Sequence, residues 1–428
     1  MSQNKGQTVG LPTMLSIVVG SIIGGAIFML PVSLAPLGWN AALGWLVSGA
    51  GALCLAFALA RLSRGGRGIQ AHIEEPFGPI PAYLAAWGFW CGVWTSIPAL
   101  ALAASSALSR INMQLGDAVV VTRLAIGFVI ALTAVNALGI RSAGRMQILT
   151  TAIKIIPLVA VILIVLLQAG RGQAPELMAA IPISLDNVAT AAALTLFALS
   201  GFENAAAPVN KVKNASRIVP LAMMIGTTFV ALLYLLSSIA VSFLLSPSAV
   251  ISSPAPFADA VASEWGEGAV QVAVFCVAVS AFGCANAGIL CAGELAYAMA
   301  LKGDLPRIFA RTRADGTPVY AQCLSGALAA GLIILNSSRD TASLFTFIIL
   351  VSLVGTLYMY LIGAAAALRV TRGVAGRILV MLGLVFVLFA FYGAGLAANA
   401  WGLLLIAIAL VVRTATRFAQ SKGLAQAT

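Results

Sequence analysis

Long apolar runs recur along the entire chain, and this feature limits what the chain can fold into more than any other. Of the 428 residues, 61% are hydrophobic and only 9% are charged, whereas roughly a quarter of the residues in an ordinary soluble domain are charged. Each run is long enough for a helix that crosses a hydrocarbon core of about 30 Å, which takes about 20 residues. The sequence therefore predicts an all-α membrane protein in which residues 1–428 form a single membrane domain.

Charged residues and breaks that contain glycine or proline divide the apolar runs into twelve expected spans. The spans lie near residues 11–36, 40–62, 81–106, 118–138, 146–168, 187–208, 218–245, 268–298, 318–336, 342–368, 376–396 and 399–415. The N-terminal residues lack a separate short apolar region with a small-residue cleavage site, so we expect the first span to act as its own insertion signal.

The basic residues are distributed unevenly between the two sets of connecting loops. Nineteen of the 24 lysines and arginines fall on the same side as the N-terminus, and only Arg110, Arg123, Arg171 and Arg339 fall opposite. By the positive-inside rule, this asymmetry predicts that both termini are cytoplasmic. The net charge of +11 is thereby explained without nucleic-acid binding, because the basic residues do not cluster on one surface.

The six cysteines all fall within apolar segments, where they act as small hydrophobes rather than as a disulfide framework. Cys276, Cys284 and Cys291 lie along one expected helix. Their spacings of eight and seven residues, in a chain with a single histidine, argue against a metal site. We expect no metal, cofactor or prosthetic group.

The first and sixth spans share glycine-containing interruptions, in "GSIIGGAIF" and "LFALSGFENAAAP". Because these spans are an odd number apart, they cross in opposite directions. Such interruptions at corresponding positions of two inverted halves indicate a secondary transporter with discontinuous helices and a site at the membrane midplane. Gly20 and Gly24 are equally explained by close helix packing. The adjacent Gly24 and Gly25 favour an unwound step, because glycine is costly inside a helix.

An unwound step exposes backbone N–H and C=O groups that must find partners within the membrane. The amides of Gly24, Gly25 and Ala26 would bind a carboxylate, helped by the half-helix dipole. The carbonyls expected to bind an α-amino group are those of Ile22, Ile23, Phe197, Ala198 and Leu199. Because a zwitterion supplies both groups, the sequence predicts an amino acid substrate.

Four segments extend this interpretation over essentially the whole chain: "GSIIGGAIFMLP", "FGPIPAYLAAWGFW", "SGFENAAAPVNKVKNASRIVPLA" and "GDLPRIFARTRADGTPVYA". Together and in this order, they resemble the amino acid–polyamine–organocation (APC) transporters, and among them the bacterial arginine/agmatine and lysine/cadaverine exchangers. The resemblance implies a LeuT-like fold with 12 transmembrane helices in two inverted five-helix repeats, with helices 1 and 6 discontinuous. Repeat one would cover about 11–168 and repeat two about 187–368, with two appended spans at about 376–415.

The resemblance also implies which residues form the walls of the substrate site. They are Phe197, Ser200, and residues near Val93, Ile97, Asn286 and Gly288. In the arginine exchangers, the tryptophan that stacks on the guanidinium aligns with Gly288 and a span-3 asparagine aligns with Ile97. A buried guanidinium would lack both partners here, and an unpaired buried charge costs several kcal/mol. We therefore expect a neutral amino acid, with arginine/agmatine-type or polyamine exchange as the alternative.

Three ionisable residues within the expected spans are candidates for coupling or gating. Lys154 is expensive in the hydrocarbon region, at ~3 kcal/mol or more; the resemblance implies that it replaces a bound sodium ion beside the first break, and snorkelling is the alternative. Glu203 aligns with a gating glutamate of the family, with a structural hydrogen bond as the alternative. Glu294 is either structural or gate-lining. A desolvated lysine can release a proton, so proton coupling stays open.

These residues predict a secondary active amino acid transporter of the inner membrane, either an exchanger or a proton-linked permease, that works by alternating access. Its partners would be an amino acid or amine substrate and the lipid bilayer, while a homodimer stays open. A channel is the alternative from another class, although the sequence contains no repeated filter and no ring of charges. An enzyme is not expected, because the spans contain no Ser/His/Asp set and no metal cluster.

Overall fold

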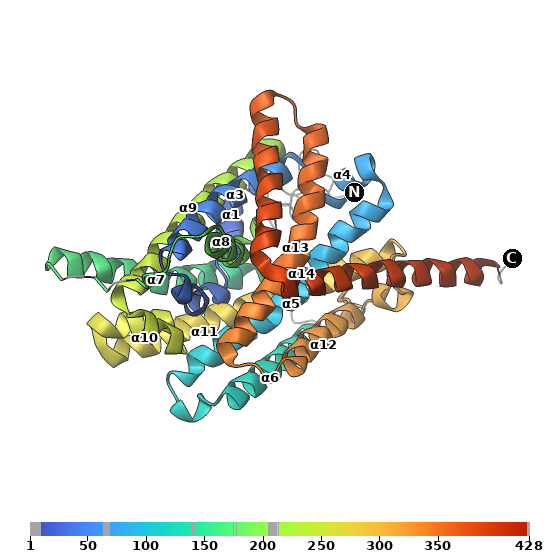
Figure 1. Cartoon of the computed structure of the whole chain (residues 1–428). Helices are drawn as coiled ribbons and strands as arrows, with labels where there is room; N and C mark the ends of the chain where they lie inside the picture. Colours follow the sequence, from blue (N-terminus) through green and yellow to red (C-terminus); the bar gives the residue numbers. More distant parts are fainter. Residues whose placement is uncertain are drawn as a thin grey trace.

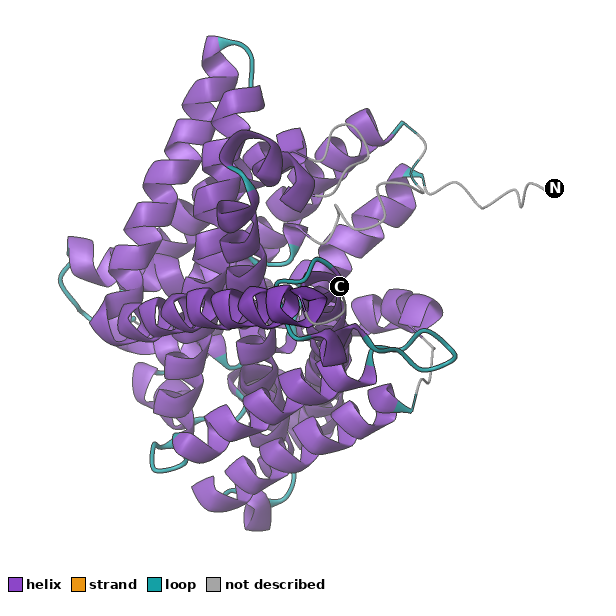
Figure 2. Ribbon diagram, turned by 90° about the vertical axis from the view of Figure 1, so that its right-hand side faces the viewer, coloured by secondary structure: helices purple, strands orange, loops and turns teal. Residues whose placement is uncertain are grey.

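The structure is a computed structural model that describes residues 10–62, 69–138, 143–173, 175–176, 178–203, 212 and 214–425. Within these residues, every element is a helix (Figures 1 and 2). Eight of the described helices are long and apolar enough to cross a membrane, and α1, α8 and α12 are shorter apolar helices. The predicted all-α class is therefore confirmed.

The described elements follow one another along the chain. They are α1 Leu11–Ile22, η1 Gly25–Phe28, α2 Leu30–Leu34, η2 Ala35–Leu37, α3 Trp39–Leu62, α4 Ile69–Phe77, α5 Pro79–Ser109, η3 Met113–Leu115, α6 Ala118–Ala137, α7 Ala143–Gly170, α8 Leu185–Leu199, α9 Ala215–Leu244, α10 Pro247–Ser252, α11 Pro256–Leu301, η6 Arg307–Ala310, α12 Val319–Leu335, α13 Thr341–Val370 and α14 Val374–Ala425.

Each expected span overlaps one or more of these helices. The spans expected at 376–396 and 399–415 correspond to two helical segments of α14, which meet at a sharp kink at Gly395 (φ 78°) (Figure 1). A glycine makes this turn without a loop, because it lacks the Cβ that disfavours positive φ. The last residues of the span expected at 187–208 lie outside the described residues.

Helix α5 lies at the centre of the bundle, between α11 and α13. In its most apolar 18-residue window, 78% of the residues are buried, against 22% for α6. The close approach of α5 and α13 requires Gly92, since a Cβ there would lie 2.1 Å from Oγ1 of Thr356. Ser352 donates a hydrogen bond of 2.6 Å to the Gly92 carbonyl. Small residues and hydroxyl bonds of this kind join helices in lipid, where apolar burial alone gives little attraction.

Candidate functional site

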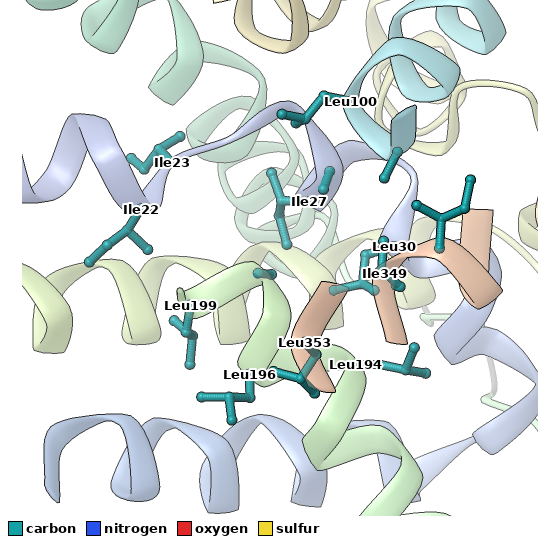
Figure 3. Close-up of a cluster of buried hydrophobic side chains, with 14 of the residues drawn as sticks. Ile22, Ile23, Ile27, Leu30, Leu100, Leu194, Leu196, Leu199, Ile349 and Leu353 are labelled. Atoms are coloured by element: carbon teal, nitrogen blue, oxygen red, sulfur yellow. The ribbon is translucent and has the colours of Figure 1, made fainter. Parts of the chain in front are cut away.

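The first helix is interrupted where the paired glycines predict an unwound step. Helix α1 ends at Ile22, Ile23 and Gly24 have extended backbones (ψ 94° and 173°), and a helical conformation resumes at Gly25 (Figure 3). The last amide to bond back into α1 is that of Ile23, which donates to the carbonyl of Val19. Because helix ends leave backbone groups without helical partners, this gap needs other groups to complete it.

The two adjacent glycines at this gap have different surroundings. A Cβ on Gly24 would meet its nearest neighbours only at 3.9 Å, whereas a Cβ on Gly25 would lie 2.4 Å from Cα of Ala281 on α11. Gly25 is therefore required for close packing against α11. Gly24 supplies an extended residue in open space.

Helix α8 is interrupted in the same way and lies against the first gap. It ends at Leu199, Ser200 is extended (ψ 149°), and Gly201 adopts φ 122°, which only glycine takes up readily. A Cβ on Gly201 would lie 2.6 Å from the carbonyl oxygen of Ser21. The two interruptions, almost 180 residues apart in sequence, are thus in direct contact.

Tyr234 of α9 spans the first gap with its hydroxyl. The hydroxyl donates to the carbonyl of Ile22 at 3.1 Å and accepts from the amide of Gly24 at 3.3 Å. The side chain is fully buried and packs edge-on against Trp45. One hydroxyl thus satisfies a carbonyl and an amide for which the broken helix provides no partner.

Lys154 of α7 approaches the same gap from another side. Its side chain is 1% exposed. Nζ donates to the carbonyl of Gly20 at 3.3 Å and to Sγ of Cys284 at 3.0 Å. The Cys284 thiol lies 3.6 Å from the carbonyl of Ile23. The ammonium therefore turns into the protein towards α1, which contradicts the snorkelling alternative.

Glu203 lies directly beyond the α8 interruption and is 6% exposed. Its Oε2 accepts hydrogen bonds of 3.0 Å from the amide of Gly201 and from the hydroxyl of Tyr360 on α13. Two donors on one oxygen hold the carboxyl group in place and tie the second interruption to α13.

A cavity of about 180 Å³ lies where these groups meet. Its walls come from α1, η1, α5, α8, α9, α11 and α13. The predicted residues that line it are Ile22, Gly24, Ala26, Val93, Phe197, Ala198, Ser200, Glu203 and Gly288. The structure thus brings the predicted parts of spans 1, 3, 6 and 8 together around one space.

The other predicted residues lie outside this lining. Ile23 and Leu199 are fully buried in the apolar cluster (Figure 3). Ile97 is buried behind Gly288, since a Cβ on Gly288 would lie 3.1 Å from Cγ1 of Ile97. Gly25 packs against Ala281, and Lys154 bonds to Gly20 and Cys284, which themselves line the cavity.

Asn286 and Glu294 also lie away from the cavity. Asn286 accepts a hydrogen bond of 2.6 Å from the side chain of Asn136 on α6. Positions 286 and 288 are separated by about 200° around the helix axis, so the two residues cannot face the same space. Asn286 therefore points towards α6 where Gly288 faces the cavity. Glu294 is exposed on α11. Asn286 thus has a partner on α6, and Glu294 is not among the residues that line the cavity.

Several lining residues were not expected from the sequence. Tyr234, Cys284, Cys291, Ser352 and Thr356 all contribute to the cavity. Ser352 and Thr356 are four residues apart on one helix face, and Tyr234 is a single hydroxyl in an apolar run. These polar residues could have been predicted to face the cavity or another helix, because polar groups inside a membrane helix need a partner.

The cavity offers hydroxyls, backbone groups and one carboxyl group, and among its described lining residues Glu203 is the only acidic or basic one. No group of three or more potential metal-ligating side chains occurs in the described part of the chain. The arrangement is therefore that of a site that can bind a small polar molecule through hydrogen bonds.

A family model and several known proteins match most of the chain. Residues 9–417 match the family model described as amino acid permease. The chain is 23% identical to the putrescine transporter PotE of Escherichia coli K12 over 94% of both chains. It is 27% identical to the cadaverine/lysine antiporter of the same strain over 91% of both chains. It is also 28% identical to the b(0,+)-type amino acid transporter 1 of Oryctolagus cuniculus, over 79% of this chain and 72% of the relative.

The family match covers nearly the whole chain, and the matched relatives are transporters and antiporters. Together with the apolar helices, these matches identify a multi-pass membrane protein of a transporter family. The protein belongs to the amino acid permease family within the APC superfamily, and it is a transporter and not an enzyme.

Proposed function

We propose that this transporter carries a neutral amino acid by alternating access, as an exchanger or a proton-linked permease. One observation carries the proposal: two interrupted helices meet beside a cavity that presents their backbone groups. Free amides at one helix start and free carbonyls at the other helix end are complementary to the two charged groups of an amino acid. The cavity of about 180 Å³ is below the roughly 300–1,000 Å³ of drug-sized sites, which suits a ligand as small as one amino acid.

The substrate carboxylate would bind at the start of the resumed helix. Tyr234 already occupies the amide of Gly24, so the amides of Gly25 and Ala26 are the next available donors. They belong to the first turn of the resumed segment, where amides have no acceptor within the helix. The positive end of the helix dipole favours a carboxylate at this place.

The α-amino group would bind on the opposite side, against carbonyls near the ends of α1 and α8. The carbonyls of Ser21, Ile22 and Ala198 come from residues that line the cavity. A carbonyl has two lone pairs, so Ile22 can accept from the substrate in addition to Tyr234. An ammonium bound in this way completes the hydrogen bonds of the interrupted helices.

The walls favour a neutral side chain. Gly288 and Val93 line the cavity, with Ile97 directly behind Gly288 and half-buried Phe197 opposite on α8. These groups provide apolar contact and no aromatic face at position 288 for a cation. A side chain with a second positive charge would gain little here to offset its desolvation.

A cationic substrate is the second candidate, and Glu203 is the observation that favours it. Its carboxyl group lines the cavity, and two bacterial relatives are named for putrescine and for cadaverine and lysine. However, Oε2 of Glu203 already accepts from Gly201 and Tyr360. A diamine would have to use the other oxygen or displace one of these donors.

We also propose the transmembrane arrangement that the resemblance implies. The chain would cross the inner membrane twelve times, with repeats at about 11–168 and 187–368 and both termini in the cytoplasm. The asymmetry of the loop charges and the direct contact of the two interruptions support this arrangement. Lys154 would then stand in for a coupling cation, since its ammonium already binds the carbonyl of Gly20 at the first gap.

The test is transport by purified protein in liposomes. Each amino acid and polyamine is offered as a competitor against a labelled neutral amino acid, with and without a pH gradient. We expect saturable uptake that internal substrate accelerates and that neutral amino acids inhibit best. Linear, unsaturable flux would indicate a channel, and inhibition by arginine, agmatine or putrescine above all neutral amino acids would overturn the substrate assignment.

The variant Glu203→Gln separates the two substrate classes. Glutamine can still accept from Gly201 and Tyr360 but carries no charge. A neutral substrate should therefore retain its affinity within a few-fold, whereas binding of a diamine should be lost. Selective loss of diamine transport, with neutral substrates inactive in the parent protein, would establish the second candidate.

A further inference from the structure

A second cavity, also of about 180 Å³, lies at the end of the bundle where α5 begins and α11 and α14 end. Glu74 of α4, Tyr83 of α5, Lys302 and Asp304 after α11, and Arg417 of α14 contribute its polar wall. Residues of α4, α5, α11 and α14 therefore surround a space that is separate from the cavity at the interrupted helices. In the proposed topology this end faces the cytoplasm.

The charges around this second cavity do not balance. Asp304 accepts from Nε of Arg413 at 2.8 Å and from an Nη atom of Arg417 at 2.9 Å. Glu74 pairs with Lys302 at 2.9 Å. Lys302 and Arg417 line the cavity together with these two carboxylates, and Arg413 lies behind the wall. The five charged groups together therefore carry one net positive charge.

The two cations at the wall are placed where a ligand can reach them. The side chains of Lys302 and Arg417 are about half exposed (48% and 50%), whereas Asp304 is 7% exposed. Arg413 is held inside, over the ring of Tyr83 at 5.4 Å. The carboxylate thus anchors the guanidinium groups from below, and the exposed cations can present further N–H donors to an anion.

The rest of the cavity and its surroundings are apolar. Ala82, Ala86 and Met299 line the inner wall. Ile80 and Leu301, which neighbour the wall residues in sequence, are 49% and 61% exposed. An anion with an attached apolar part matches this combination better than a free ion does.

We propose that this cavity binds the headgroup of an anionic phospholipid. The phosphate would lie between Lys302 and Arg417, and the acyl chains would follow the exposed apolar side chains. Basic pockets between helices at the cytoplasmic surface recognise anionic lipids by this chemistry. Because α5 and α11 also form walls of the substrate cavity, the bound lipid holds together the helices on which transport depends.

The test measures lipid binding and does not depend on transport. Purified protein is titrated with phosphatidylglycerol or phosphatidylcholine, and bound lipid is counted by native mass spectrometry, with thermal unfolding as the second readout. The paired variant Glu74→Gln/Lys302→Gln removes one cation without leaving its partner unpaired. Adding Arg417→Gln removes a second cation while Arg413 still pairs with Asp304.

The matched control is Arg171→Gln/Glu264→Gln, which removes an ion pair near the opposite end of the bundle. We expect phosphatidylglycerol to bind more tightly than phosphatidylcholine and to raise the unfolding temperature. Each removed cation should weaken its binding about fivefold, since a basic side chain near an anionic lipid contributes ~1 kcal/mol. The control should bind like the parent protein.

Two results would overturn the proposal. Equal binding of both lipids, or unchanged phosphatidylglycerol binding in the triple variant, would show that this cavity does not select an anionic headgroup. If millimolar inorganic phosphate displaced the lipid and gave the same thermal shift, the site would belong to a soluble phosphate compound and not to a lipid.

Discussion

The hydroxyl of Tyr234 lies 3.3 Å from the amide of Gly24 and at the same time donates to the carbonyl on the other side of the gap. A side chain from α9 thus replaces part of the hydrogen bonding that α1 loses where it unwinds. The first interruption is held open before any substrate is present, because its polar groups already have a partner. Substrate then needs to satisfy only the groups that remain.

We predict that Tyr234→Phe impairs transport without unfolding the protein. The change leaves the Ile22 carbonyl and the Gly24 amide without this partner, and a lost buried hydrogen bond costs about 1–3 kcal/mol. If this free energy destabilises only the conformation that binds substrate, KM should rise by about tenfold. Proteoliposome kinetics measure the change, with exposed Tyr320→Phe as the control. An unchanged KM would show that the hydroxyl does not order the gap.

Replacing Lys154 by methionine is expected to abolish transport or its dependence on a pH gradient. Methionine keeps much of the side-chain length but cannot donate to Gly20 and Cys284. The folded protein should remain, because the uncharged side chain suits its buried position better. Size-exclusion chromatography and uptake assays test this, with lipid-facing Ile156→Met as the matched control. Normal, still pH-dependent exchange would remove Lys154 from the transport cycle.

The two glycines of the gap should respond differently to alanine. In Gly25→Ala, the new methyl group would lie 2.4 Å from the backbone of Ala281, so α11 must move. We expect a loss of about 1–3 kcal/mol in stability, as for other overpacked sites. In Gly24→Ala, the methyl group meets only contacts of 3.9 Å at a φ of −104°, so stability should hardly change. Thermal unfolding compares the two, and equal melting temperatures would contradict the predicted difference.

A thiol reagent should block transport by reaching Cys284. This thiol lines the cavity beside Lys154, and all six cysteines are free. In variants that keep a single cysteine, N-ethylmaleimide should inactivate the Cys284 protein and substrate should protect it, whereas the variant that keeps exposed Cys323 should stay active. Labelling without loss of activity would show that Cys284 does not border the transport path.

Asp340 caps the N-terminus of α13, and its carboxylate accepts from the amide of Ser343 at 2.9 Å. Hydrogen bonding by the Ser343 side chain, and then by this amide, lowers the pKa of Asp340 below its usual 3.8. A lowered pKa stabilises the fold above the unfolded-state value, and the effect is lost as the pH falls through the native-state value. Asp340→Ala should cost about 1 kcal/mol at neutral pH. The gap between variant and parent should narrow as unfolding is measured at lower pH, and a gap independent of pH would contradict this mechanism.

The sequence determined the features that depend on neighbouring residues. Apolar runs of sufficient length predicted the helices, because a membrane leaves the backbone few other ways to satisfy its hydrogen bonds. Gly24 with Gly25, and Gly201 after Ser200, marked the interruptions, since the local cost of glycine in a helix does not depend on distant contacts. Lys154 and Glu203 were recognisable as well, because a charge in an apolar span needs a partner somewhere.

Only the tertiary structure decided which partners those were. Tyr234 and Cys284 lie more than 200 residues from the groups they bond at the first gap. Asn286 turns to Asn136 while Gly288, two residues on, faces the cavity, and Gly25 packs against Ala281, a contact that the sequence did not predict. A membrane helix is apolar on all sides, so its sequence pattern does not show which side faces its neighbours. The contacts between helices depend instead on how side chains fit across their interfaces.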